Sequence, residues 1–219
     1  HWSPDGQTLA AATGDRTLLW WRPDSNTVQR GERKVGWNAH VCWSPKGDWL
    51  AAASTDRIVR LWKPNGRVGL ELPGHTADIR GVAWKPDGSQ LASGGEDGSS
   101  RLWNLDGRAG AMLSPKESRQ LLALDWSPDG KQIAAVGRQP QLVLWNLETG
   151  DSREIPLPAS SYSLRVRWSP NGDRLAVRSD DKLVLFDETG RRLPEPKQPS
   201  GIQDLAWSHD GRQLLTSAW

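Results

Sequence analysis

The chain has 219 residues, of which 36% are hydrophobic and 25% charged, the size and balance of one folded globular domain. Its 28 Lys and Arg residues nearly balance 26 Asp and Glu and are scattered without runs, so charge gives no reason to expect a nucleic-acid partner. One cysteine excludes an internal disulfide, and neither a membrane-spanning run of ~18 apolar residues nor a signal peptide is recognisable, so we expect a soluble, cytoplasmic protein without a membrane partner.

A short turn motif repeats along the whole chain. It reads Trp-Ser-Pro-Asp-Gly at its first occurrence and returns, varied, at steps of 41, 41, 42, 42 and 39 residues. The repeats start at Trp2, Trp43, Trp84, Trp126, Trp168 and Trp207. Ser-Pro-Asp-Gly places Pro at the second position of a type I turn and Gly at the fourth, so the motif predicts a hairpin turn between two strands.

Each repeat unit predicts the same series of short strands. An inner strand precedes the turn Trp, as in residues 79–84, 121–126 and 202–207. The second strands are expected at residues 9–12, 50–53, 91–94, 133–136 and 175–178. The third strands end in an aromatic residue and cover residues 18–21, 58–62, 99–103, 142–145 and 183–186. Weaker fourth strands are expected at residues 68–72, 110–113 and 153–157.

Four short antiparallel strands in about 40 residues form one blade of a β-propeller. The sequence therefore predicts an all-β fold with about five and a half blades. Ten of the fourteen Trp residues occupy the turn position or the end of the third strand, so most of the Trp content is explained by the repeat. Because the chain starts near the end of an inner strand and stops after a second strand, we expect residues 1–219 to be one propeller domain, incomplete at both ends, from a ring of six to eight blades.

These residues resemble the WD-repeat family of β-propellers, in its bacterial type with Trp-Ser-Pro-Asp-Gly turns. The third unit matches best, with a Gly-His pair before its inner strand and Leu-Trp on its third strand. The resemblance implies that His75, Ser93, Asp97 and Trp103 form a buried, structural hydrogen-bonded set. None of the third strands ends in a literal Trp-Asp pair.

The resemblance also implies where a partner binds. In the family, contact residues lie six and four positions before the turn Trp and directly before the turn Asp. From these positions we predict a partner-binding face of Trp37, Asp78, Arg80, Glu96, Gln120, Leu122, Tyr162 and Leu164. Trp, Tyr and Arg dominate interface energetics. The alternative for the two aromatic residues is that they fill gaps between loops.

Charged residues recur in matching positions of neighbouring inner strands. Asp125 and Arg167 share one position, and Arg165 and Asp204 share another, so we predict two ion pairs between blades. Arg60 and its third-strand equivalent Arg101 are expected to pack their stems along a blade with their charged groups in solvent.

The chain contains none of the common catalytic or phosphate-binding motifs. We therefore predict a non-catalytic scaffold in signalling, without metal or cofactor, that docks a protein or peptide on its loop face. By resemblance, kinase, protease or NTPase modules are expected outside this segment. The alternative is a small-ligand-binding or hydrolytic propeller that uses polar residues such as His40, Asp125, Arg165 and Arg167 at a central channel.

Overall fold

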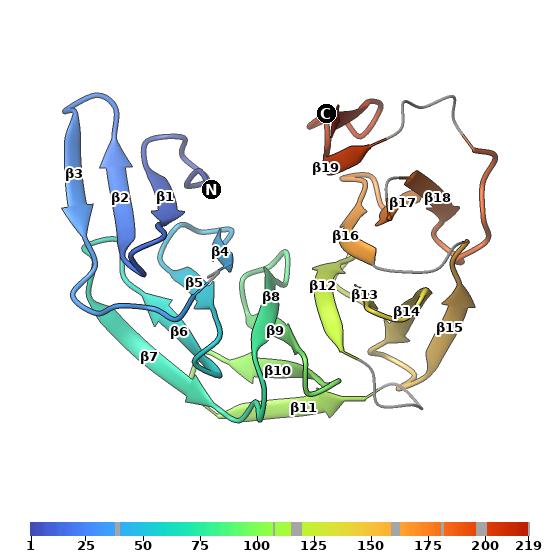
Figure 1. The fold of residues 1–219 in the computed structure, drawn as a ribbon, viewed down its shortest axis with the longest axis horizontal. Helices are drawn as coiled ribbons and strands as arrows, with labels where there is room; N and C mark the ends of the chain where they lie inside the picture. Colours follow the sequence, from blue (N-terminus) through green and yellow to red (C-terminus); the bar gives the residue numbers. More distant parts are fainter. Residues whose placement is uncertain are drawn as a thin grey trace. The chain divides into compact units, whose positions relative to one another are not determined.

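The computed structural model describes residues 1–37, 40–106, 108–114, 120–158, 163–180, 182–195 and 201–218 (Figure 1). At residues 109, 163, 164 and 218 it describes the backbone alone. Every regular element of this part of the chain is a β-strand. The chain divides into two compact units, His1–Leu113 and Ser114–Trp219.

Unit 1 contains three antiparallel sheets, here called blades 1 to 3, whose strands pair in chain order. Blade 1 has β1 (Leu9–Ala12), β2 (Leu18–Arg22) and β3 (Thr27–Arg30), with a single bridge from Trp2 to Leu9 in place of a regular inner strand. Blade 2 has β4 (His40–Trp43), β5 (Leu50–Ala53), β6 (Ile58–Trp62) and β7 (Val68–Pro73). Blade 3 has β8 (Ile79–Trp84), β9 (Gln90–Gly95), β10 (Ser100–Asn104) and β11 (Ala109–Leu113).

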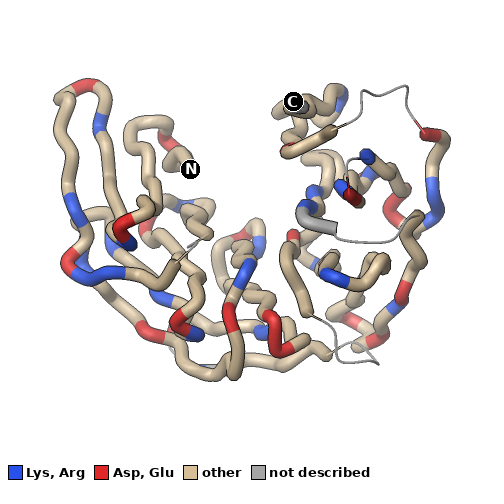
Figure 2. The backbone as a smooth tube through the Cα atoms, viewed as in Figure 1, with Lys and Arg blue, Asp and Glu red and all other residues tan. Residues whose placement is uncertain are grey.

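Unit 2 contains three further sheets, blades 4 to 6, with the same antiparallel chain-order pairing. Blade 4 has β12 (Leu121–Trp126), β13 (Gln132–Gly137), β14 (Gln141–Asn146) and β15 (Ser152–Pro156). Blade 5 has β16 (Ser163–Trp168), β17 (Arg174–Ser179) and β18 (Lys182–Asp187), and blade 6 has β19 (Ile202–Trp207) and β20 (Leu214–Ala218). The predicted all-β fold of four-stranded antiparallel blades is confirmed, and the assignment to one incomplete domain stays a prediction. Figure 2 shows basic and acidic residues interspersed along the strands and turns of both units.

The recurring turn has the geometry that its sequence predicts. In the first copy the N–H of Gly6 donates to the carbonyl of Ser3 at 2.9 Å, and the Ser3 hydroxyl accepts the N–H of Thr8 at 2.9 Å and donates to Asp5 at 2.5 Å. The glycine that ends each of the six turns has a φ between 67° and 76°, a conformation that other residues rarely adopt. The motif therefore fixes the hairpin that aligns each inner strand with its second strand.

The indole of the turn Trp explains why this position needs Trp rather than another aromatic residue. The Nε1–H of Trp43 donates to the His1 carbonyl at 3.1 Å, and that of Trp84 donates to the Cys42 carbonyl at 3.2 Å. In unit 2, Trp207 reaches Arg167 in the same way at 3.1 Å. Each bond joins the inner strand of one blade to the carbonyl before the turn Trp of the preceding blade, so the repeated Trp links neighbouring blades.

The core of unit 1 lies between its blades, and blade 2 is buried on both faces. Trp62 packs with Trp20 on the face toward blade 1, whereas Trp103 belongs to the cluster on the other face. Trp62 and Trp103 are 0% and 2% exposed. Trp21 has the same register as Trp62 but is 36% exposed, so the equivalent Trp of blade 1 is not a core residue. Because Trp20 points toward blade 2, the next residue lies on the opposite face of the sheet.

Candidate functional site

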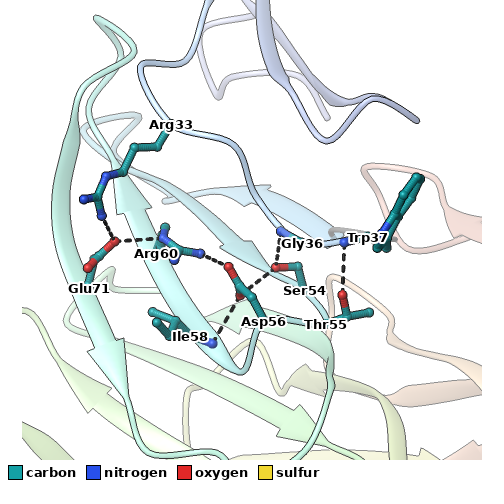
Figure 3. Close-up of polar contacts among 9 residues, drawn as sticks. All are labelled: Arg33, Gly36, Trp37, Ser54, Thr55, Asp56, Ile58, Arg60 and Glu71. Atoms are coloured by element: carbon teal, nitrogen blue, oxygen red, sulfur yellow. Dashed lines mark hydrogen bonds and ion pairs between the residues drawn. The ribbon is translucent and has the colours of Figure 1, made fainter.

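The candidate site is built on the loops at one end of blades 1 and 2, and its centre is the segment 35–37. The N–H of Val35 donates to the Arg16 carbonyl at 2.9 Å, in the turn that closes β1. The N–H of Gly36 donates to Ser54 Oγ and that of Trp37 to Thr55 Oγ1, both at 3.0 Å, in the turn that closes β5 (Figure 3). This segment is therefore fixed to the turns of two neighbouring blades by its backbone.

The backbone of Trp37 is fixed by these contacts, whereas its side chain faces solvent. Trp37 is 57% exposed, and in Figure 3 its ring points away from the turn that holds it. The Arg16 guanidinium carbon lies 5.5 Å from the centroid of this ring, within the range of a cation–π contact. A large, exposed aromatic side chain on a fixed backbone is the kind of residue that anchors a partner.

Beneath this segment, Arg60 holds the turn that carries Ser54 and Thr55. Arg60 Nε lies 2.9 Å from Glu71 Oε1, and its guanidinium also pairs with Asp56, whose carboxylate accepts the Ser54 hydroxyl at 2.9 Å (Figure 3). Arg60 is only 9% exposed. The expectation that its charged group lies in solvent is wrong, because Asp56 four residues earlier and Glu71 on β7 supply two carboxylates within reach.

The ion pairs of Arg60 with Asp56 and Glu71 favour the charged forms of Arg60 and Glu71. Burial alone would lower the pKa of Arg60, but the contacts with Asp56 and Glu71 raise it above its usual value. Hydrogen bonding to Arg60 lowers the pKa of Glu71, which also binds Arg33 at 2.6 Å. Since Arg33 lies just before the segment 35–37, the ion pairs tie β6, β7 and the connection to blade 2 together.

Three predicted contact residues of blade 3 form one cluster of charges. Arg80 Nη2 lies 2.8 Å from Glu96 Oε1 and 3.2 Å from Asp78 Oδ2, and Arg80 Nε donates to Glu96 at 2.9 Å. The side chains are 18% to 33% exposed, so they are accessible to a partner although they are partly buried. The structure thus brings together three of the residues predicted for the partner-binding face.

The four residues predicted as a structural set in blade 3 are in hydrogen-bond contact. Trp103 Nε1–H donates to Ser93 Oγ at 2.8 Å, and Ser93 Oγ lies 2.7 Å from His75 Nε2. His75 Nδ1 lies 2.8 Å from Asp97 Oδ2. All contacts are satisfied when Ser93 donates to Nε2 of a neutral imidazole and Nδ1–H donates to Asp97. Burial lowers the pKa of His75, more than Asp97 raises it, which favours this neutral form.

The predicted contact residues of unit 2 are described less completely. Gln120 and Leu122 are both partly buried at the start of the inner strand of blade 4. Leu164 lies on β16 with only its backbone described, and Tyr162 lies outside the described residues. The predicted contact residues whose side chains are described and form one partly exposed group therefore lie on unit 1.

The two predicted ion pairs of unit 2 differ from each other. Arg165 Nε lies 3.1 Å from Asp204 Oδ1, and both side chains are exposed. Asp125 and Arg167 form no direct ion pair among the described residues, which corrects that prediction. Asp125 accepts the backbone N–H of Trp168 at 2.9 Å, whereas Arg167 donates to the Val166 carbonyl at 3.1 Å. Burial raises the pKa of Asp125, and the charge of Arg167 and the amide of Trp168 offset only part of this effect.

Two negative findings concern the described part of the chain. Within it, no group of three or more His, Cys, Asp or Glu side chains is arranged to hold a metal ion. No described segment forms a helix that could span a membrane.

A hollow of about 430 Å³ lies between blades 1 and 2 at the Trp-Ser-Pro-Asp-Gly turns, with Ser3, Asp5, Arg22 and Trp43 among its lining residues. Ser3 and Asp5 already bond each other there, as part of the turn.

The comparison with protein families agrees with the strand pattern and with the buried set of blade 3. The WD40 family, described as "WD domain, G-beta repeat", matches residues 1–22, 38–63 and 66–104. The matched residues of unit 1 are therefore WD repeats. The matched segments contain the strands of blades 1 to 3 except β3 and β11, and the sheets of unit 2 repeat the same strand order. No curated protein matches the chain. WD repeats generally mediate protein–protein interaction and are typically non-catalytic.

The sequence pattern named Trp37, Asp78, Arg80 and Glu96, and it missed the residues that support them. Asp56 lies four residues before Arg60, and this spacing could have suggested that the two side chains pair. The roles of Arg16 and Arg33 depend on contacts across blades, at separations of 21 and 38 residues, which the sequence does not show.

Proposed function

We propose that this WD-repeat protein is a non-catalytic scaffold that docks a protein or peptide on the loop end of unit 1. The observation that carries the proposal is the exposed side chain of Trp37, whose backbone is fixed to the turns of blades 1 and 2. Anchor residues of this type, held in place before binding, lose little conformational entropy when a partner arrives.

The charged cluster of Asp78, Arg80 and Glu96 supports the same proposal. It lies in the equivalent loops of the next blade, so it extends the site from blade 2 to blade 3. Charged groups beside an aromatic anchor contribute orientation and association rate more than affinity. The proposed docking site therefore combines Trp37 as anchor with Arg80 and its two carboxylates as an orienting group.

A second candidate function, binding or hydrolysis of a small ligand, is favoured by one observation. Asp125 is partly buried and its burial raises its pKa, as for a carboxyl group that acts as a general acid. Its hydrogen bond to Trp168 gives it a structural role as well. Asp125→Asn keeps the shape of the side chain, so a hydrolytic activity of the intact chain that this variant abolishes would support the second candidate.

The cellular setting is part of the proposal and rests on the resemblance alone. We propose a cytoplasmic scaffold in signalling, with kinase, protease or NTPase modules as the fused or associated enzymes. Fractionation of cells that express the natural protein, followed by detection in the cytoplasmic fraction, tests the location directly.

The docking surface is tested by affinity capture with the 219-residue chain as bait. Proteins captured from an extract of the source organism are compared between the wild type and the double variant Trp37→Ala/Arg80→Ala by quantitative mass spectrometry. The matched control is Met112→Ala/Arg67→Ala, because Met112 is also 57% exposed and Arg67 is an exposed arginine between β6 and β7. We expect the first variant to lose partners that the control retains. Equal capture by all three baits would refute the assignment.

A further inference from the structure

Two arginines occupy backbone positions that suit glycine better. Arg16 and Arg57 follow the turn Asp of blades 1 and 2 and have φ angles of +68° and +66°. The same position in blade 3 is Gly98, with a φ of +78°. Among the described residues, the other non-glycine residues with positive φ are Asn26 and Asp180, types that tolerate this conformation. Non-glycine residues held in this conformation cluster at functional sites.

The guanidinium groups of these arginines are not neutralised by a carboxylate of the described residues, although that of Arg16 lies over the Trp37 ring. Arg16 and Arg57 are exposed, and neither forms an ion pair with a side chain of the described residues. The carboxylates next to them are already engaged. Asp15 accepts the Thr13 hydroxyl at 2.5 Å and the N–H of Thr17, and Asp56 is held by Arg60 and the Ser54 hydroxyl. Each turn thus presents a positive charge that its own aspartate does not neutralise.

The two turns that carry these arginines both contact the segment of Trp37. Arg16 is stacked near the ring, and its carbonyl accepts the N–H of Val35 two residues before Trp37. On the other side, the hydroxyl of Thr55, two residues before Arg57, accepts the N–H of Trp37. The segment that carries the exposed indole is therefore fixed to two turns, and each turn carries an exposed arginine. An arginine that lies near an aromatic ring can still bind a carboxylate through its N–H groups.

We infer that Arg16, Trp37 and Arg57 form a subsite for an acidic peptide segment, in which an apolar residue covers Trp37 and flanking carboxylates bind the two arginines. This inference rests on the proposed function and specifies the chemistry of the partner. A long polyanion such as nucleic acid fits less well, because the neighbouring loops of blade 3 present Asp78 and Glu96 and the net charge of the chain is only +2. A short protein segment needs only these three side chains.

The decisive variant is Arg16→Gly/Arg57→Gly, because it separates binding from stability. Glycine adopts a positive φ without strain, so we expect a melting temperature equal to the wild-type value or up to about 3 °C higher. Binding of a fluorescein-labelled peptide, in which glutamates flank a single leucine, is measured by fluorescence anisotropy. We expect the double variant to bind about tenfold more weakly, as for the loss of two exposed ion pairs. The control Arg67→Gly removes a positive charge from the turn between β6 and β7 and should bind as the wild type does.

Three results would overturn the inference. These are equal binding of the same peptide with glutamine in place of glutamate, equal binding by the wild type and Arg16→Gly/Arg57→Gly, and tighter binding of a single-stranded oligonucleotide than of the acidic peptide at the same salt concentration. The proposed function would survive each of them if Trp37→Ala/Arg80→Ala still lost captured proteins in the capture experiment. The two proposals therefore fail separately.

Discussion

The hydroxyl of Ser93 is the centre of the buried set in blade 3, and removing it tests the hydrogen-bond account of the blade. In Ser93→Ala, the indole N–H of Trp103 and Nε2 of His75 both lose their partner inside the core. Ser93 and Trp103 are 0% and 2% exposed, so water cannot replace the hydroxyl. A buried polar group left without a partner costs about 1–3 kcal/mol. We therefore expect unit 1 to lose about 2–4 kcal/mol of stability.

The same blade supplies a matched control. Ser100 on β10 is also 0% exposed, but its hydroxyl has no hydrogen-bond partner among the described residues. Ser100→Ala removes an unsatisfied polar group, so it should leave stability unchanged or raise it by up to about 1 kcal/mol. Both substitutions remove one oxygen atom from a buried strand residue, and they differ in the hydrogen bonds lost.

The stability of both variants is measured by urea denaturation, followed by tryptophan fluorescence. Hydrogen exchange of the β9 and β10 amides assigns the transition to unit 1. For a chain of this size the loss in Ser93→Ala corresponds to roughly 5–10 °C in melting temperature. Equal stabilities of Ser93→Ala and Ser100→Ala would refute the reasoning, because the burial of the two residues is the same.

Three further predictions test other parts of the structure. Trp84→Phe should cost about 1 kcal/mol more than Trp168→Phe in unfolding experiments, because Trp84 donates a hydrogen bond to the preceding blade whereas Trp168 Nε1 has no partner among the described residues; equal costs would contradict the role given to the indole. Burial lowers the pKa of His75 below its ordinary 6.5, so the stability that neutral His75 contributes is present above pH 6.5 and is lost as the pH falls below that value. The melting temperatures at neutral and mildly acidic pH should therefore differ less in His75→Gln than in the wild type. An equal pH dependence in the two proteins would contradict this role of His75. Arg60→Met should leave Asp56 and Glu71 without their shared partner and weaken capture through Trp37, whereas Arg67→Met should do neither when both are measured for stability and capture.

The sequence predicted the blades well because each strand is fixed by local signals. The Ser-Pro-Asp-Gly turn specifies its own hairpin, and its hydrogen bonds join residues at most five apart. The set of His75, Ser93, Asp97 and Trp103 was implied by the family pattern within a single repeat. Both features lie inside one blade, where the spacing along the chain decides which side chains meet.

The contacts between blades were predicted less well. The position of Trp21 followed the repeat, but whether it is buried depends on which face of blade 1 a neighbouring blade covers. Matching positions suggested a pair of Asp125 and Arg167, yet the carboxylate accepts the backbone amide of Trp168, a donor that the side-chain pattern of the sequence does not show. Arg60 shares its position with hydrophobic residues in three other repeats, and its contact with Glu71 depends on the pairing of β6 with β7.

The most direct test of the docking site is a binding measurement on the loop end of unit 1. A partner isolated with the wild-type chain is titrated against Trp37→Ala/Arg80→Ala and against Met112→Ala/Arg67→Ala, with the fold of each variant checked by its melting curve. The account predicts that the affinity falls about tenfold or more for the first variant and stays at the wild-type value for the second. Wild-type affinity in a folded Trp37→Ala/Arg80→Ala protein would contradict it.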